Sequence, residues 1–131
     1  MVDAWAAEAS YGDRVSEQPV TTGGSAPSGV VEARTADDGS VIVLLRGSLG
    51  PECADELRRL VVRTVRRVRP SRLIVDLTDV VTLDPINVGT LIAACLLGED
   101  HAVAVLLVNP GPELAYRLAL AGVPEGSVIR R

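Results

Sequence analysis

Blocks of apolar residues alternate with polar turns from Val30 to the end of the chain, and their spacing predicts the secondary structure. Alternating or continuous apolar runs predict strands over residues 30–35, 41–46, 73–77, 102–108 and 127–131. Apolar residues three and four positions apart predict helices over residues 51–69, 86–98 and 112–121. Because strands alternate with helices, the pattern predicts an α/β domain.

Residues 1–29 differ in composition from the rest of the chain. They are poor in large aliphatic side chains and end in a run of glycine, serine and threonine from Thr21 to Gly29. Such a composition is typical of a flexible linker. We therefore expect a mostly disordered tail over residues 1–29 and one folded domain over residues 30–131.

The predicted helix over residues 86–98 carries no charged residue. One face is formed at helical spacing by Val88, Leu91, Ile92 and Cys95, and the opposite face by Ile86, Thr90, Ala93 and Leu97. A helix that is apolar all round is either buried on both sides or in contact with a partner. The second face is thus a candidate interaction surface, unless neighbouring elements cover it.

Composition and charge narrow the range of functions. Only 2% of the residues are aromatic, so the core is aliphatic and the stacking platforms of single-strand nucleic-acid binders are absent. All basic residues are arginines, and three of them, Arg59, Arg63 and Arg66, share the outer face of the first predicted helix. Because the net charge is −4, we interpret this face as solvated rather than as a nucleic-acid surface.

Residues for catalysis or metal binding are sparse. The chain has one histidine, His101, and two cysteines, and it lacks glycine-rich nucleotide motifs and a nucleophile motif. A helix start would stabilise a thiolate at Cys53, but no histidine or second cysteine lies near it in sequence. We expect no enzyme activity, no cofactor and no metal. No secretory signal or membrane span is evident, so we expect a cytoplasmic protein without direct membrane insertion.

Several strings, in order, resemble the STAS domain, a family named for sulfate transporters and anti-sigma factor antagonists. Residues 41–50 resemble the second strand and the turn after it, and residues 73–80 resemble the central strand. Leu83-Asp84-Pro85-Ile86-Asn87-Val88-Gly89 is similar to the signature that opens the second helix. The resemblance covers residues 30–129 and implies a small mixed sheet with helices packed mainly on one face.

The resemblance also implies a function in bacterial signalling and transcription regulation. Stand-alone STAS domains bind anti-sigma factors or related serine kinases and so free a sigma factor. We expect the partner to contact the start and outer face of the second helix and the loop before the first. The implied contact residues are Ser48, Gly50, Asp84, Ile86, Asn87, Thr90, Ala93 and Leu97.

The signature departs from the family at the phosphorylation switch. Ile86 occupies the phosphoacceptor serine position, and an isoleucine side chain has no hydroxyl to accept phosphate. Thr82 and Thr90 are the nearest alternative acceptors. We therefore expect a binding module without the serine switch. The alternative is a scaffold or accessory subunit of a signalling assembly or of a membrane transporter complex.

Overall fold

A computed structural model of the chain describes residues 29–131. The tail that the sequence predicts over residues 1–29 lies, apart from Gly29, outside the described residues. The described part forms one five-stranded sheet with helices, in agreement with the α/β fold that the sequence predicts.

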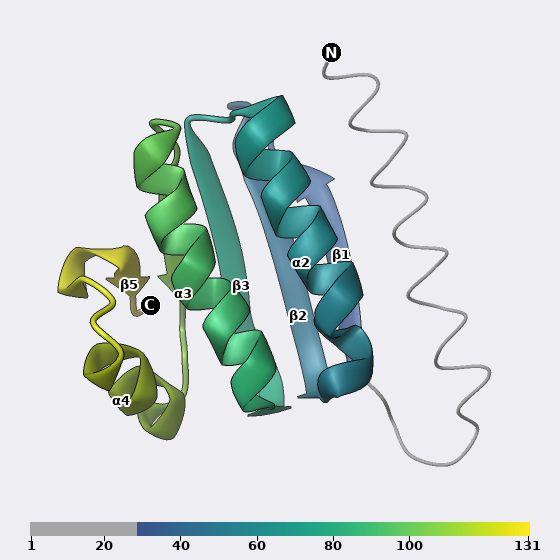
Figure 1. Ribbon diagram of the computed structural model, residues 1–131, viewed down its shortest axis with the longest axis vertical. Helices are drawn as coiled ribbons and strands as arrows, with labels where there is room; N and C mark the ends of the chain where they lie inside the picture. Colours follow the sequence, from purple (N-terminus) through teal and green to yellow (C-terminus); the bar gives the residue numbers. More distant parts are fainter. Residues whose placement is uncertain (1–28) are drawn as a thin grey trace.

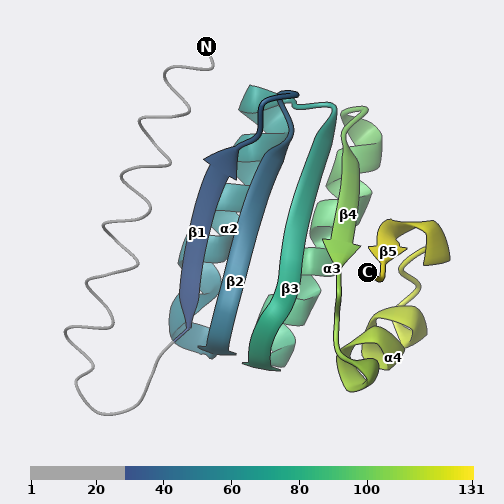
Figure 2. The ribbon, with the colours of Figure 1, turned by 180° about the vertical axis from the view of Figure 1, so that it is seen from behind.

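The sheet has the strand order β1-β2-β3-β4-β5, so strands that follow one another in sequence are neighbours in space. Their bounds are Val30–Thr35 for β1, Val41–Leu49 for β2, Arg72–Leu83 for β3, Ala104–Val108 for β4 and Val128–Ile129 for β5. The first two strands are antiparallel, and all later neighbours pair in parallel. The sheet is thus mixed, with its antiparallel pair at one edge (Figure 2).

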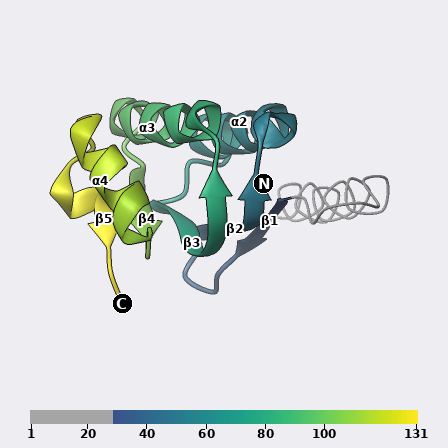
Figure 3. The same ribbon diagram turned by 90° about the horizontal axis from the view of Figure 1, so that it is seen from below.

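Helices connect the parallel strands. Their bounds are Pro51–Cys53 for η1, Ala54–Arg63 for α2, Thr64–Val68 for η2, Pro85–Asp100 for α3, Pro112–Leu120 for α4 and Glu125–Ser127 for η3. The two long helices α2 and α3 lie side by side on one face of the sheet, whereas α4 lies near the edge formed by β4 and β5 (Figures 1 and 3). The starts of α2 and α3 lie at the same end of the molecule (Figure 1).

The core is aliphatic, as the scarcity of aromatic residues requires. Alternate residues of β2 and β3 point toward the helices and are fully buried, including Val43 and Val75. Leu57 and Val61 of α2 and Leu91 of α3 meet them from the other side. Burial of one such side chain contributes roughly 1.5–3 kcal/mol, so this interface is the main source of stability.

Several boundaries differ from those predicted. The central strand β3 continues to Leu83 instead of ending at residue 77, because its second half pairs with β2 after β4 has ended. Its exposed residues there include the β-branched Thr78, Val81 and Thr82, which favour an extended backbone. The first long helix ends in the π-helical turn η2, closed by Arg69 in the left-handed region with φ 50°.

Candidate partner-binding surface

The start of α3 is fixed by Asp84 and Pro85. The Asp84 side chain accepts a hydrogen bond of 3.0 Å from the Ile86 backbone amide, and Pro85 occupies the first helical turn. Both are favoured residues at a helix N-terminus. The aspartate side chain accepts from a free backbone amide, and proline has no amide hydrogen that would need an acceptor. The Ile86 side chain is therefore held at the rim of the helix, with 53% of its surface exposed.

The loop after β2 is tied to the same helix start. The Asp84 backbone amide donates to the Leu49 carbonyl at 2.9 Å. The Asn87 side-chain amide donates to the carbonyls of Leu49 and Gly50 at 3.0 and 2.9 Å. Ser48 lies at the end of β2, in register with Thr82 of β3. The two segments that the sequence predicts to form one surface are thus joined by three hydrogen bonds.

Asn87 is the predicted contact residue that the structure places in the interior. It is fully buried, and both hydrogens of its amide are directed at the loop carbonyls. A side chain in this position holds the loop against the helix and offers nothing to a partner. Asn87 is thus a positioning residue, which corrects its assignment to the surface.

The outer face of α3 is apolar, but its residues differ in part from those predicted. Ile86 and Ala93 are exposed, while Thr90 and Leu97 are half-buried, and Leu97 packs against the core. The outward position at the end of this face belongs to Leu96, which is 61% exposed. The inner face is marked by buried residues three and four positions apart: Asn87, Leu91, Ala94 and Gly98. The exposed residues at the same spacing form the outer face: Ile86, Gly89, Ala93 and Leu96.

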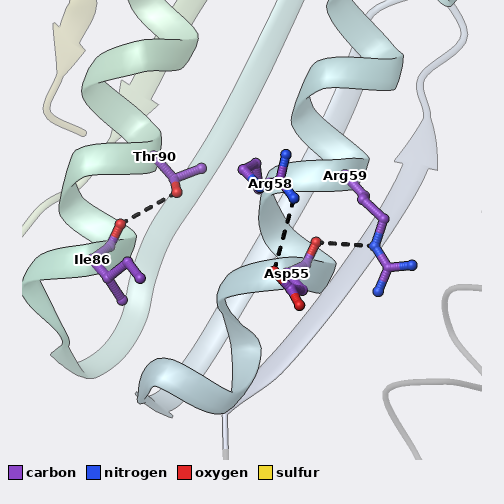
Figure 4. A network of polar contacts seen from close by, with 5 residues as sticks. All are labelled: Asp55, Arg58, Arg59, Ile86 and Thr90. Atoms are coloured by element: carbon purple, nitrogen blue, oxygen red, sulfur yellow. Dashed lines mark hydrogen bonds and ion pairs between the residues drawn. The ribbon is translucent and has the colours of Figure 1, made fainter.

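A groove runs between α2 and α3, and the contribution of α2 to it is not predicted from the sequence. It is lined by Arg58, Val61, Val62, Gly89, Thr90, Ala93, Ala94, Leu96, Leu97 and Asp100. Arg58 and Thr90 lie on the facing sides of the two helices, whereas Arg59 points away on the outer side of α2 (Figure 4). The groove is apolar along its length, with one charged residue of each sign among its lining residues.

The two candidate phosphoacceptors are placed differently. Thr82 is exposed near the end of β3, beside the exposed side chain of Val81. Thr90 is half-buried, and its hydroxyl donates to the Ile86 carbonyl at 3.3 Å (Figure 4). On accessibility, Thr82 is the better candidate of the two.

Both cysteine thiols are buried, which disfavours the thiolate. Burial raises the pKa of the Cys53 thiol, and the carboxylates of Glu52 and Glu56 raise it further. Burial likewise raises the pKa of Cys95 to about 11. The stabilised thiolate that a helix start would give Cys53 is therefore not found.

Residues with catalytic or metal-binding potential are engaged in local structure. The ring nitrogen Nδ1 of His101 lies 3.0 Å from the Leu97 carbonyl, at the end of α3. Asp76 accepts hydrogen bonds from the amide and hydroxyl of Thr78. Within residues 29–131, no three histidine, cysteine or acidic residues are grouped as a metal site would require. No helix in the same range has the length and apolar character needed to cross a membrane.

The family model of the STAS domain matches residues 31–129, and the chain belongs to this family. Its structure is similar to that of phosphorylated SpoIIAA from Bacillus, with a TM-score of 0.69 and 16% identity over 78% of this chain and 91% of that one. A variant of RsbS from Moorella thermoacetica has a TM-score of 0.62 and 16% identity, covering 77% of this chain and 86% of its own.

A third similar structure is that of an anion transporter, the murine solute carrier 26 family member A9. Its TM-score is 0.59 with 19% identity, and the match covers 88% of this chain but only 22% of the transporter. No curated protein matches the chain in sequence. At these identities, the three structures show a shared fold. The match spans most of the SpoIIAA and RsbS chains but only a small part of the transporter.

Proposed function

We propose that this STAS domain is a binding module for an anti-sigma factor or a related serine kinase. One observation carries the proposal. The start of α3 and the groove beside it form a continuous apolar surface, running from Ile86 through Ala93 to Leu96, on a fold similar to that of SpoIIAA. Exposed apolar surface of this kind is typical of sites for protein partners.

The surface has the make-up of a protein interface. Ile86 and Leu96 supply exposed aliphatic side chains, and Arg58 and Asp100 supply charges at the groove. Burying one such aliphatic side chain contributes roughly 1.5–3 kcal/mol, while charged residues at a rim mainly set orientation and specificity. Within this proposal, Ser48 and Gly50 complete the contact area, because hydrogen bonds hold their loop beside the start of α3.

The same surface lacks the serine switch. In the family, phosphate on the serine at this position adds charge to an uncharged contact surface and weakens binding. Here the position holds Ile86. The hydroxyl of Thr90, one turn further along α3, donates a hydrogen bond to the Ile86 carbonyl. We infer that binding is constitutive and is controlled by the amount of protein rather than by phosphorylation.

The similarity to an anion transporter supports a second candidate, an accessory role in a membrane transporter complex. The match covers 88% of this chain, so the fold suits either role. The two candidates differ in the partner they require.

A sigma-release assay separates these candidates. Purified anti-sigma factors from the source organism, each bound to its sigma factor, are mixed with the full chain, and free sigma factor is measured with and without ATP. Release from one complex, equal in both conditions, is the expected result. No release from any complex, together with co-purification with a transporter, contradicts the proposal and favours the accessory role.

A further inference from the structure

An arginine-rich face lies on α2 and η2, outside the surface described above. Between Leu57 and Val75, arginine is the only charged residue type. The arginines of this stretch are all exposed: Arg58, Arg59, Arg63, Arg66, Arg67, Arg69 and Arg72. Positive charge at this density is costly unless an anionic group lies close to it.

The described residues neutralise only part of this charge. Arg72 pairs with Asp38 at 2.6 Å, and Arg58 lies 3.9 Å from Asp55. Arg59 and Arg69 donate instead to backbone carbonyls, which carry no net charge (Figure 4). In residues 29–131, no carboxylate is within salt-bridge distance of Arg66 or Arg67.

Three of these arginines share one direction. Arg59, Arg63 and Arg66 follow the spacing of four and three residues that places side chains on one face of a helix. The buried residues Leu57 and Val61 occupy the opposite side of α2. We call Arg59, Arg63 and Arg66 the arginine face.

The N-terminal segment of the same chain has the opposite charge. Residues 1–28 carry four acidic residues, Asp3, Glu8, Asp13 and Glu17, against the single basic residue Arg14. Gly29, where the described chain begins, has its carbonyl 4.0 Å from the Cys53 sulfur in η1. The segment is therefore tethered beside the start of α2, the helix that bears the arginine face.

The tether is long enough for the two charged parts to meet. Glu17 precedes Gly29 by 12 residues, which span up to about 40 Å when extended. The helical stretch from Ala54 to Val68 has 15 residues and, at about 1.5 Å per residue, a length of about 22 Å. A short tether also gives an effective concentration on the order of millimolar, which favours an acidic segment of the same molecule over a free ligand.

We propose that residues 1–28 bind the arginine face of their own domain through their acidic side chains. The proposal rests on charge complementarity and on the point of tethering, and it stands independently of the proposed function. A nucleic acid or the segment of a second molecule would be the other occupants of a cationic surface, and the test distinguishes them.

The test uses the full ¹⁵N-labelled chain and its amide resonances. In the double variant Arg59→Glu and Arg66→Glu, the resonances of residues 3–17 should shift away from their wild-type positions at low salt. Wild-type resonances should move to the same positions as salt rises to about 1 M, because salt screens the attraction. A matched control, Arg130→Glu and Arg131→Glu, changes the net charge equally at exposed residues of the other chain end and should leave residues 3–17 unchanged.

Four results would overturn the proposal. Resonances of residues 3–17 that do not respond to the arginine variant would show that the segment lies elsewhere. An equal response to the control variant would reveal a general effect of net charge, and a response that grows with protein concentration would reveal binding between molecules. If the arginine variant weakens binding of an added oligonucleotide and leaves the resonances of residues 3–17 unchanged, the face is a nucleic-acid site. Unchanged resonances in β2 and β3 would verify that each variant is folded.

Discussion

Asp84 accepts a hydrogen bond from the backbone amide of Ile86, and this contact holds Ile86 at the first turn of α3. In the function proposed above, this helix start corresponds to the family's switch site, with an aliphatic side chain in place of the phosphoacceptor serine. On that proposal, the half-exposed Ile86 is part of the contact surface and is not a site of modification.

Replacing Ile86 by serine should create a phosphoacceptor. The side chain is half-exposed, so the Ile86→Ser variant should fold, with a change in unfolding free energy of less than about 1 kcal/mol. Intact-mass spectrometry after incubation with ATP and a kinase of serine-bearing STAS domains should find one phosphate on the variant. The wild-type chain and the Ile86→Ala control should carry none. Stoichiometric phosphate on Thr82 or Thr90 of the wild type, with loss of partner binding, would show that the switch has moved.

Asn87→Ala should destabilise the domain and loosen the loop after β2. The substitution removes two buried hydrogen bonds and leaves the carbonyls of Leu49 and Gly50 without that donor. The expected loss is about 1–3 kcal/mol of unfolding free energy in a urea titration. Thr90→Ala is the control, because it removes a weaker contact at a half-buried position. Equal effects of the two variants would refute a special role for Asn87.

Two glycines of α3 should respond to alanine in opposite directions. A Cβ atom at Gly98 would lie 2.5 Å from the Val103 carbonyl oxygen, so Gly98→Ala should cost about 1–3 kcal/mol. A Cβ atom at Gly89 meets nothing within 4 Å, and alanine is the better helix former, so Gly89→Ala should stabilise the domain by up to about 1 kcal/mol. Thermal melting of both variants checks the pair, and a stabilised Gly98→Ala variant would contradict the packing described here.

The raised pKa of Cys95 gives the stability of the domain a dependence on alkaline pH. The folded state holds the thiol proton up to a pKa of about 11, whereas the unfolded chain loses it near the ordinary thiol pKa of 9.0. The contribution of this proton is therefore complete below pH 9 and is lost as the pH rises toward 11. Urea titrations between pH 8 and 11 should show this decline, and it should be shallower in the Cys95→Ala variant. Parallel declines in the two proteins would rule out the thiol as their cause.

Much of the fold follows from local sequence signals. Pro51, Pro85 and Pro112 stand at the helix starts, where their missing amide hydrogen costs nothing. Continuous apolar runs such as residues 73–77 mark strands that helices cover, because only a buried strand tolerates so many aliphatic side chains. The order and type of the elements could therefore be predicted, and the STAS signature at Asp84 added the topology.

The details of the surface could not be predicted in the same way. A helix without charges, such as α3, does not indicate which of its apolar residues point outward. The sequence pattern therefore predicts Leu97 on the outer face, whereas Leu96 is the exposed residue. The burial of Asn87 depends on carbonyls that are 37 and 38 residues away in sequence. Val62 enters the groove only because α2 packs beside α3. Each of these features arises from contacts between elements, which no local pattern contains.

The most direct test of the central claim compares the affinities of three variants for the anti-sigma factor found by the sigma-release assay. Isothermal titration calorimetry with Ile86→Asp and Leu96→Asp should show at least about tenfold weaker binding than the wild type, a loss of about 1.4 kcal/mol, because each places a charge in the proposed interface. Leu120→Asp places the same charge at a similarly exposed leucine of α4 and should bind like the wild type. Wild-type affinity in folded Ile86→Asp and Leu96→Asp variants would contradict the claim that the partner binds at α3.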